Sequence, residues 1–187
     1  MEFIKKEKNG REHLRNLLLC SLFAAFLAVC SWISVPVLTV PFTLQTFGVF
    51  LTLCFLGGRL GTVTVLLYLT LGAIGVPVFS GFRGGIGVLL GPTGGYLLGF
   101  LFSGLIYWLL TAKRSPVSGL YRLAVLTAAL VGCYLFGSLW FLGSTADGTI
   151  GFWGVLMKCV VPYLLPDFLK MILASRLSDL LLRVSHR

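Results

Sequence analysis

Charged residues are distributed very unevenly along this chain. No Asp, Glu, Lys or Arg lies between Arg15 and Arg59, and three later stretches are also free of charge, at 60–82, 84–112 and 123–146. A helix that crosses a bilayer needs about 20 predominantly apolar residues. The first stretch therefore has room for two spans and a connection, and each later stretch has room for one. With a sixth span expected in the C-terminal third, the sequence predicts an all-α membrane protein of six transmembrane helices.

The composition agrees with a membrane protein rather than a soluble domain. Of the 187 residues, 57% are hydrophobic and 11% are charged, whereas an average soluble domain carries roughly 25% charged residues. The formal net charge of +9 would also fit a nucleic-acid-binding protein. The positions of the basic residues, however, indicate that the charge reports membrane topology.

With six spans and a cytosolic N-terminus, the cytosolic segments contain all but three of the 15 Lys and Arg residues. Cytosolic loops of membrane proteins carry such an excess of basic residues, so no nucleic-acid partner is expected. The chain is predicted to be a multi-pass protein of the cell membrane with both termini cytosolic. Its predicted parts are an N-terminal tail at 1–13, a six-helix membrane domain at 14–183 and a C-terminal tail at 184–187.

The spans are expected at about 14–34, 44–57, 60–75, 93–112, 120–142 and from Pro166 onward. Prolines and β-branched residues in VPVLTVPFTLQ favour extended backbone outside the membrane. The stretch FWGVLMKCVVPYLL is expected to form a short helix at the outer interface. Pro166 fits the first position of the last helix, which would place Asp167 in the first turn, where the helix dipole favours an anion.

Two ionisable residues lie three positions apart near the start of the last predicted span, in the sequence LPDFLK. This spacing puts Asp167 and Lys170 on one face of a helix. Ionisable groups inside a membrane are costly to insert and commonly mark a functional site. The alternative is a pair that only neutralises its own charge, but two leucines would insert at no such cost.

A third charge, Arg83, lies in a glycine-rich outside segment and is placed to reach the same region. Its alternative role is that of an interfacial arginine extending toward lipid headgroups. Tyr96, Gln45 and Thr43 are expected to add neutral hydrogen bonds. One acceptor with one or two cations suits a small ligand that has N–H donors at one end and a carboxylate at the other.

Catalysis and cofactor binding find little support in the sequence. The two histidines, His13 and His186, fall in the two tails, and the five cysteines form no C-x-x-C pair. No metal cluster, nucleophile–histidine pair or nucleotide-binding motif is recognisable. The chain is therefore expected not to be an enzyme, to hold no metal or cofactor, and to depend on partners for any use of ATP.

The chain contains four stretches that resemble the BioY family, the biotin-specific S components of energy-coupling factor (ECF) transporters. They are VPFTLQTFGVFLT, LLYLTLGAIGVPVF, GGIGVLLGPTGGYLLGF and PDFLK. The similarity runs from about residue 21 to residue 175. It implies an ECF S-component fold of six helices, with biotin bound near the outer face and no catalytic activity.

The resemblance also implies roles for particular residues. Asp167 would accept hydrogen bonds from the ureido N–H groups of biotin, Lys170 would counter its carboxylate, and Tyr96 is the tyrosine of the GPTGGY motif. Ala24 and Ala28 match an alanine motif on the first helix that docks onto a transmembrane coupling subunit, which in turn works with two ATPase subunits. Small residues four apart let helices approach closely in lipid, so internal packing is the alternative for this pair.

Two positions depart from the family pattern. Arg83 stands where relatives more often have glycine or a small polar residue, and Leu97 follows GGY where some relatives carry a basic residue. Either change affects how the carboxylate would be bound. The predicted function is a biotin-binding membrane subunit that mediates biotin uptake with an ECF energising module. The alternatives are a stand-alone carrier for biotin or another small vitamin and, more distantly, an intramembrane lipid-modifying enzyme with Asp167 and Lys170 as acid and base.

Overall fold

The computed structural model describes residues 2–36, 40–114, 118–145 and 151–185, with side chains from Gly10 to Val184 within these ranges. The described chain is almost entirely helical. Its elements are α1 (Glu2–Trp32), β1 (Ser34–Val35), β2 (Phe42–Thr43), α2 (Gln45–Ala73), α3 (Ile86–Leu90), α4 (Gly94–Thr111), α5 (Gly119–Ser144), α6 (Phe152–Cys159) and α7 (Val161–Ser185). The fold is thus an all-α membrane fold, apart from two two-residue strands.

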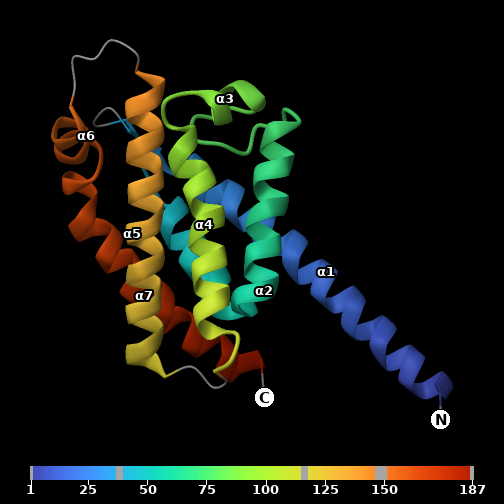
Figure 1. Cartoon of the computed structure of the whole chain (residues 1–187). Coiled ribbons are helices and arrows are strands. Elements are labelled where there is room, and N and C mark those ends of the chain that lie inside the picture. Colours follow the sequence, from blue (N-terminus) through green and yellow to red (C-terminus); the bar gives the residue numbers. More distant parts are fainter. Residues whose placement is uncertain (1, 37–39, 115–117, 146–150, 186–187) are drawn as a thin grey trace.

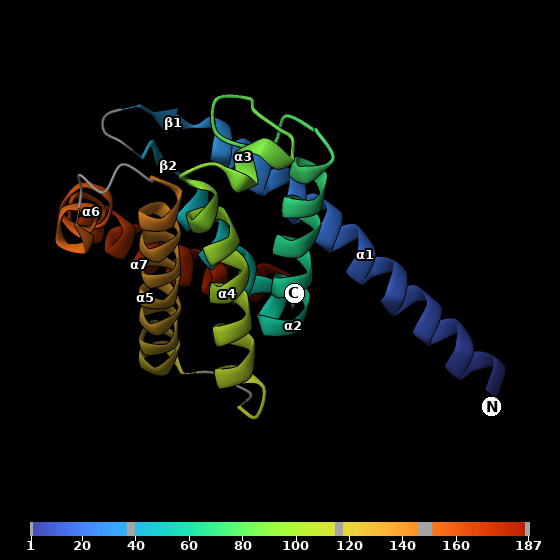
Figure 2. The same cartoon turned by 45° about the horizontal axis from the view of Figure 1, so that its top comes forward.

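Helix α2 lies at the centre of the bundle, where it packs against α1, α4 and α7, while α4 also packs along α5. Figure 1 shows that the N-terminal half of α1 extends away from the body of the molecule. The short strands β1 and β2 pair antiparallel. Together with α3 they lie over the upper ends of the long helices in Figure 2. This upper end of the bundle carries the site described below.

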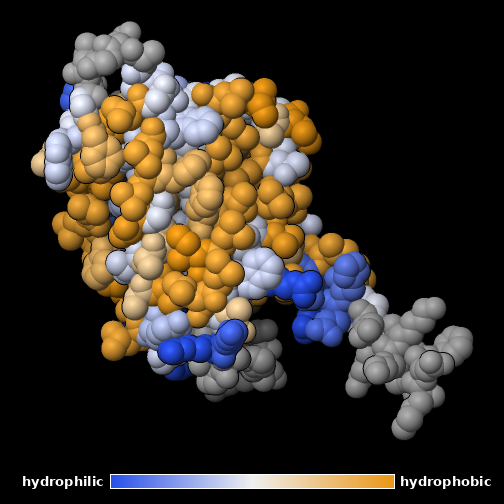
Figure 3. Space-filling model, in the orientation of Figure 1, coloured by the Kyte–Doolittle hydropathy of each residue, from blue (hydrophilic) through white to orange (hydrophobic). Residues whose placement is uncertain are grey.

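Four helical segments are long and apolar enough to cross a membrane: Gly10–Trp32, Gln45–Ala73, Gly94–Thr111 and Gly119–Ser144. Hydrophobic atoms cover most of the body in Figure 3, and hydrophilic atoms gather near its lower end and on the described N-terminal part of α1. A broad apolar surface of this kind suits contact with lipid. The described chain therefore has the surface of a multi-pass membrane protein.

The predicted spans at about 44–57 and 60–75 are both contained in α2. Between these two predicted spans the backbone is helical except at Gly57, whose φ of 78° and ψ of 169° interrupt the helix. A positive φ of this size is readily adopted by glycine and disfavoured for other residues. The interruption falls at the junction between the two predicted spans and divides α2 into two helical segments.

Gly58, next to this break, allows α2 to approach α4 closely. A Cβ added at Gly58 would lie 2.5 Å from the Cα of Trp108, a backbone atom that cannot rotate away. Gly58→Ala is therefore expected to destabilise the fold by about 1–3 kcal/mol, which thermal unfolding in detergent would measure. Gly143→Ala is the matched control, since nothing lies within 4 Å of its added Cβ. Equal melting temperatures for the two variants would contradict this packing.

The last helix begins earlier than predicted. Helix α7 starts at Val161 and contains Pro166 in its interior, so Pro166 does not begin the helix and Asp167 does not lie in its first turn. Pro162 lies in the first turn, where backbone N–H groups have no intrahelical acceptor, so its missing N–H breaks no helical hydrogen bond. The helix-dipole argument for Asp167 is therefore wrong, and its charge is balanced by side chains instead.

At the opposite end of α7, a second polar cluster joins this helix to α5. Arg122 on α5 is buried; its Nε donates to Ser175 Oγ at 2.9 Å and its Nη2 to Asp179 Oδ2 at 2.6 Å. A buried guanidinium needs such partners because leaving its donors unpaired would be costly. This cluster holds α5 and α7 together at the end of the bundle far from β1 and β2.

Candidate ligand-binding site

A cavity lies beneath β2 and the loops at the upper end of the bundle. All six residues predicted to contact a ligand line it: Thr43, Gln45, Arg83, Tyr96, Asp167 and Lys170. They come from β2, the start of α2, the loop before α3, α4 and α7. The structure thus brings together residues that are up to 127 positions apart in the sequence. Apolar and aromatic side chains, among them Phe79, Phe100 and Tyr163, line the rest of the cavity.

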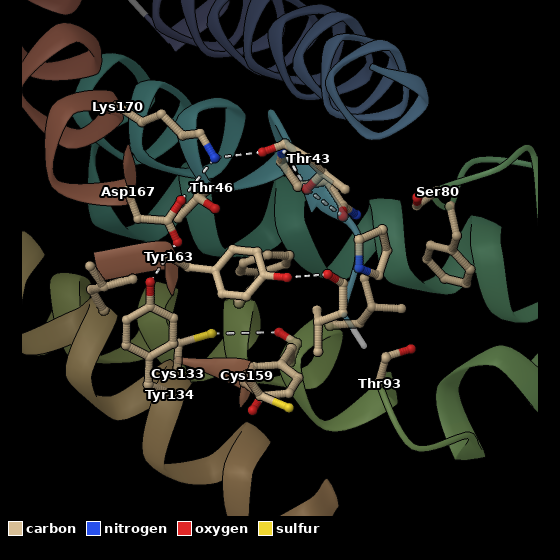
Figure 4. A pocket seen from close by; sticks show the side chains of 18 of the residues that line it. Thr43, Thr46, Ser80, Thr93, Cys133, Tyr134, Cys159, Tyr163, Asp167 and Lys170 are labelled. Carbon is tan, nitrogen blue, oxygen red and sulfur yellow. Dashed lines mark hydrogen bonds and ion pairs between the residues drawn. The ribbon is translucent and has the colours of Figure 1, made fainter. Parts of the chain in front are cut away.

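The Asp167–Lys170 pair on α7 is held by neighbours on two other elements, β2 and α5 (Figure 4). Lys170 Nζ donates to Asp167 Oδ1 at 2.8 Å and to the backbone carbonyl of Thr43 at 2.6 Å. It also lies 3.8 Å from the ring centroid of Phe42, a cation–π distance. Asp167 Oδ2 accepts the hydroxyl proton of Tyr134 at 2.6 Å. Both charged side chains are buried, and each already has well-placed protein partners.

A second hydrogen-bond network fixes Gln45 at the start of α2. Thr43 Oγ1 donates to Gln45 Oε1 at 3.1 Å, and Gln45 Nε2 donates to Tyr68 Oη at 2.7 Å. Tyr68 is 1% exposed and in turn donates to the carbonyl of Val78 at 3.1 Å. The network orients the Gln45 amide and connects it to the loop that carries Arg83. One N–H of the amide is used by Tyr68, which leaves the other for a ligand.

Arg83 lies in a tight turn between α2 and α3. Phe79 and Arg83 pair across the turn, and the positive φ values of Gly81 (72°) and Phe82 (56°) close it. The left-handed region costs a non-glycine residue on the order of 1–2 kcal/mol. Trp32, at the end of α1, stacks on Phe82 with ring centroids 5.0 Å apart and stabilises the turn. The glycine-rich segment therefore builds a tight turn around Arg83.

The Arg83 side chain is exposed at the cavity, and its Nε donates to the carbonyl of Ser80 at 3.1 Å. Figure 4 shows Ser80 on the opposite side of the cavity from Lys170 and Asp167. The cavity therefore has an ion pair at one end and the loop with a guanidinium at the other.

Tyr96 directs its hydroxyl toward α5, where it lies 3.2 Å from Ser138 Oγ. The glycines around it are explained by close packing: an added Cβ at Gly95 would lie 2.2 Å from Trp140, and one at Gly137 would lie 2.2 Å from the Tyr96 ring. Gly95 and Gly137 therefore allow α4 and α5 to pack closely around Tyr96. Tyr96 lines the cavity mainly with its ring.

The sequence analysis missed three residues that support this site: Phe42, Tyr68 and Tyr134. Tyr68 and Tyr134 each place a hydroxyl inside an otherwise apolar helix, and a buried hydroxyl needs a hydrogen-bond partner. This requirement could have indicated from the sequence that the two tyrosines bind other polar groups in the bundle. The partner itself was not visible, because it lies 33 positions from Tyr134 along the chain.

The cavity offers binding chemistry rather than a reactive group. Among the residues with described side chains, no three His, Cys, Asp or Glu residues come together as a metal site would require. The polar groups that line the cavity are a carboxylate with both oxygens fixed, a primary amide, hydroxyls, two buried thiols, the Lys170 ammonium and an exposed guanidinium. Such a set suits a small molecule that carries N–H donors and an anionic group.

Comparison with known proteins agrees with this geometry. A model of the BioY family matches residues 5–187. The chain belongs to the BioY family. It is 39% identical over 169 residues to the biotin transporter BioY of Thermotoga maritima, which covers 87% of this chain and 100% of that relative. It is 39% identical over 163 residues to a probable biotin transporter BioY of Pyrococcus horikoshii, and the match covers 85% of this chain and 93% of that relative.

The fold of this BioY-family chain also matches a solved structure. The crystal structure of the S component for biotin from an ECF-type ABC transporter superposes with a TM-score of 0.81, covering 92% of this chain and 93% of the other. The identity between them is 24%, so this match concerns the fold. The match confirms the expected likeness to an S-component fold, and the family model together with the two relatives confirms the family assignment.

The predicted docking face on α1 is not available in this structure. Ala24 and Ala28 are 3% and 5% exposed and belong to the chain's own hydrophobic core. Helix α1 packs closely on α2 here, since a Cβ added at Gly48 would lie 3.0 Å from the Leu27 side chain. Internal packing, the alternative for the two alanines, is the role that the structure gives them. Ser21 and Ala25, on the neighbouring face of α1, are exposed.

Proposed function

We propose that this chain is the biotin-binding S component of an ECF transporter in the cell membrane and delivers biotin into the cell. The observation that carries the proposal is the cavity with a fixed Asp167–Lys170 pair at one end and exposed Arg83 at the other. Biotin has the matching chemistry, because it joins a cyclic urea with two N–H groups to a carboxylate through an apolar chain. Family membership supports the same ligand.

The membrane topology that we propose has six spans and two cytosolic termini. Gly57 divides α2 into two segments, which contribute two crossings in addition to those of α1, α4, α5 and α7. Six crossings return the chain to the side on which it began, and the start of α1 and the end of α7 lie toward the same, lower side in Figure 1. The basic residues of the tails favour the cytosol on that side. The cavity would then open outward.

The proposed pose places the urea at Asp167 and the carboxylate at Arg83. Lys170 is an unsuitable partner for the carboxylate, because its ammonium already contacts Asp167, the Thr43 carbonyl and the Phe42 ring. Arg83 keeps guanidinium donors for the ligand, and an arginine binds a carboxylate in a bidentate manner. Lys170 would instead keep β2 in place over the bound vitamin.

This pose predicts that Arg83→Gln weakens the binding of biotin but not of biotin amide. Loss of one partly exposed charge-assisted pair should raise the dissociation constant for biotin about tenfold, and the neutral amide should bind with nearly unchanged affinity. Competition binding with both ligands measures this. Lys158→Gln is the control, since Lys158 is exposed on α6 and is not among the residues that line the cavity. Equal losses for both ligands would contradict the pose.

Uptake in intact cells tests the transport part of the proposal. Labelled biotin would be supplied to cells without their own biotin uptake, with this chain produced alone or together with a coupling subunit and two ATPase subunits. We expect uptake that depends on the complete module and on ATP hydrolysis by the ATPases. Equal uptake by the chain alone would identify a stand-alone carrier instead.

A further inference from the structure

We propose that Tyr134 on α5 is a positioning residue for ligand recognition and acts through Asp167. Its hydroxyl holds the Asp167 carboxylate so that the remaining lone pairs face the N–H groups of the ligand. The inference rests on the proposed function, because it assumes that Asp167 receives these N–H groups. Neither the sequence motifs nor the family resemblance singled out Tyr134.

The first argument is the occupancy of the two carboxylate oxygens. Lys170 Nζ donates to Oδ1 at 2.8 Å, and the Tyr134 hydroxyl donates to Oδ2 at 2.6 Å. Each carboxylate oxygen accepts about two hydrogen bonds, so each keeps one free site. Two fixed donors on the protein side therefore set the plane of the carboxylate, and a ureido N–H of the ligand can donate to a site that remains.

The second argument is that Tyr134 has no substitute on its side of Asp167. Tyr134 and Leu130 line both the cavity and an apolar groove between α5 and α7, on whose other wall lie Leu164 and Phe168. Apart from Tyr134, the only hydroxyl lining this groove is that of Thr127, which donates to the backbone carbonyl of Leu123 at 2.9 Å. Without the Tyr134 hydroxyl, Oδ2 would face apolar atoms on the groove side.

The third argument separates this role from helix packing. The Tyr134 side chain is buried, and phenylalanine would keep its ring as the wall between the cavity and the groove. The α5–α7 pair also remains joined by the Arg122 cluster with Ser175 and Asp179. Tyr134→Phe should therefore fold and remove little more than one hydrogen bond to a charged group.

The test compares biotin with an analogue in which one ureido N–H is replaced by oxygen. In Tyr134→Phe, the dissociation constant for biotin is expected to rise by about tenfold or more, as for other hydrogen bonds to charged groups. For at least one of the two possible analogues, the same substitution should raise the dissociation constant only about twofold to threefold. That analogue already lacks the N–H group that donates to Asp167. The control is Tyr121→Phe on the same helix, which removes a hydroxyl that donates to the Leu110 carbonyl at 2.8 Å outside the cavity and should leave the affinity for biotin unchanged.

The outcomes are distinguishable from failure of the proposed function. If the unmodified protein does not bind biotin, the proposed ligand is wrong. If it binds biotin but Tyr134→Phe weakens biotin and both analogues by the same factor, Tyr134 acts through packing and the inference is overturned. An unchanged affinity for biotin in a folded Tyr134→Phe protein would overturn it as well.

Discussion

Replacing Asp167 with asparagine is expected to raise the dissociation constant for biotin by about 100-fold or more. The substitution exchanges an ionised acceptor for a neutral amide at the end of the cavity where the urea would bind. It also replaces the ionic partner of the buried Lys170 ammonium with a neutral amide oxygen. Equilibrium binding of labelled biotin to detergent-purified protein measures the loss.

The matched control for this change is Asp179→Asn on the same helix. Asp179 pairs with buried Arg122 at 2.6 Å and is not among the residues that line the cavity. Removing its charge should lower the stability of the protein while leaving the affinity for biotin nearly unchanged. Wild-type affinity in the Asp167→Asn protein would contradict the assignment of Asp167 as a ligand-binding residue.

Lys170→Met is expected to have the largest effect on stability. It leaves the Asp167 carboxylate buried without its cation, and breaking a buried ion pair from one side typically costs about 3–5 kcal/mol. It also removes the contact that joins α7 to the Thr43 carbonyl of β2. We expect a clearly lower melting temperature in detergent and, because β2 covers the cavity, weaker binding of biotin.

The double variant Asp167→Asn/Lys170→Met separates folding from binding. Removing both charges eliminates the unpaired group, so the melting temperature should recover most of the loss seen in Lys170→Met alone. Affinity for biotin should stay low, because the acceptor for the urea is still missing. A double variant that is stable and binds biotin like the unmodified protein would show that the pair only neutralises its own charge.

The sequence was sufficient to predict the class of fold and the approximate place of most helices. Long charge-free stretches permit few other structures in lipid, where backbone groups must be satisfied within a helix. The helix boundaries were predicted less well. Whether Gly57 makes a turn or a single break, and whether Pro166 begins a helix or lies inside one, depends on packing against α1, α4 and α5 that local sequence does not report.

The charged residues of the site were predicted because a charge in a membrane span is rare and usually has a function. The motif residues were predicted as neutral hydrogen-bonding groups that lie within the stretches resembling the family. Apart from the Asp167–Lys170 pair itself, the hydrogen-bond partners of these residues were not predicted. Tyr68 and Tyr134 look like ordinary core residues in sequence, and their roles depend on which helices face each other across the bundle. The same limit applies to Ala24 and Ala28: small residues indicate a close helix contact, but not whether the partner is internal or another chain.

Equilibrium binding of labelled biotin to the purified chain, with biotin, biotin amide, thiamine and riboflavin as unlabelled competitors, tests the central proposal most directly. We expect saturable, tight binding that biotin displaces fully, biotin amide displaces more weakly because it lacks the carboxylate for Arg83, and thiamine and riboflavin do not displace. A folded protein that does not bind biotin, or that binds another of these vitamins in its place, would contradict the proposed function while leaving the fold unaffected.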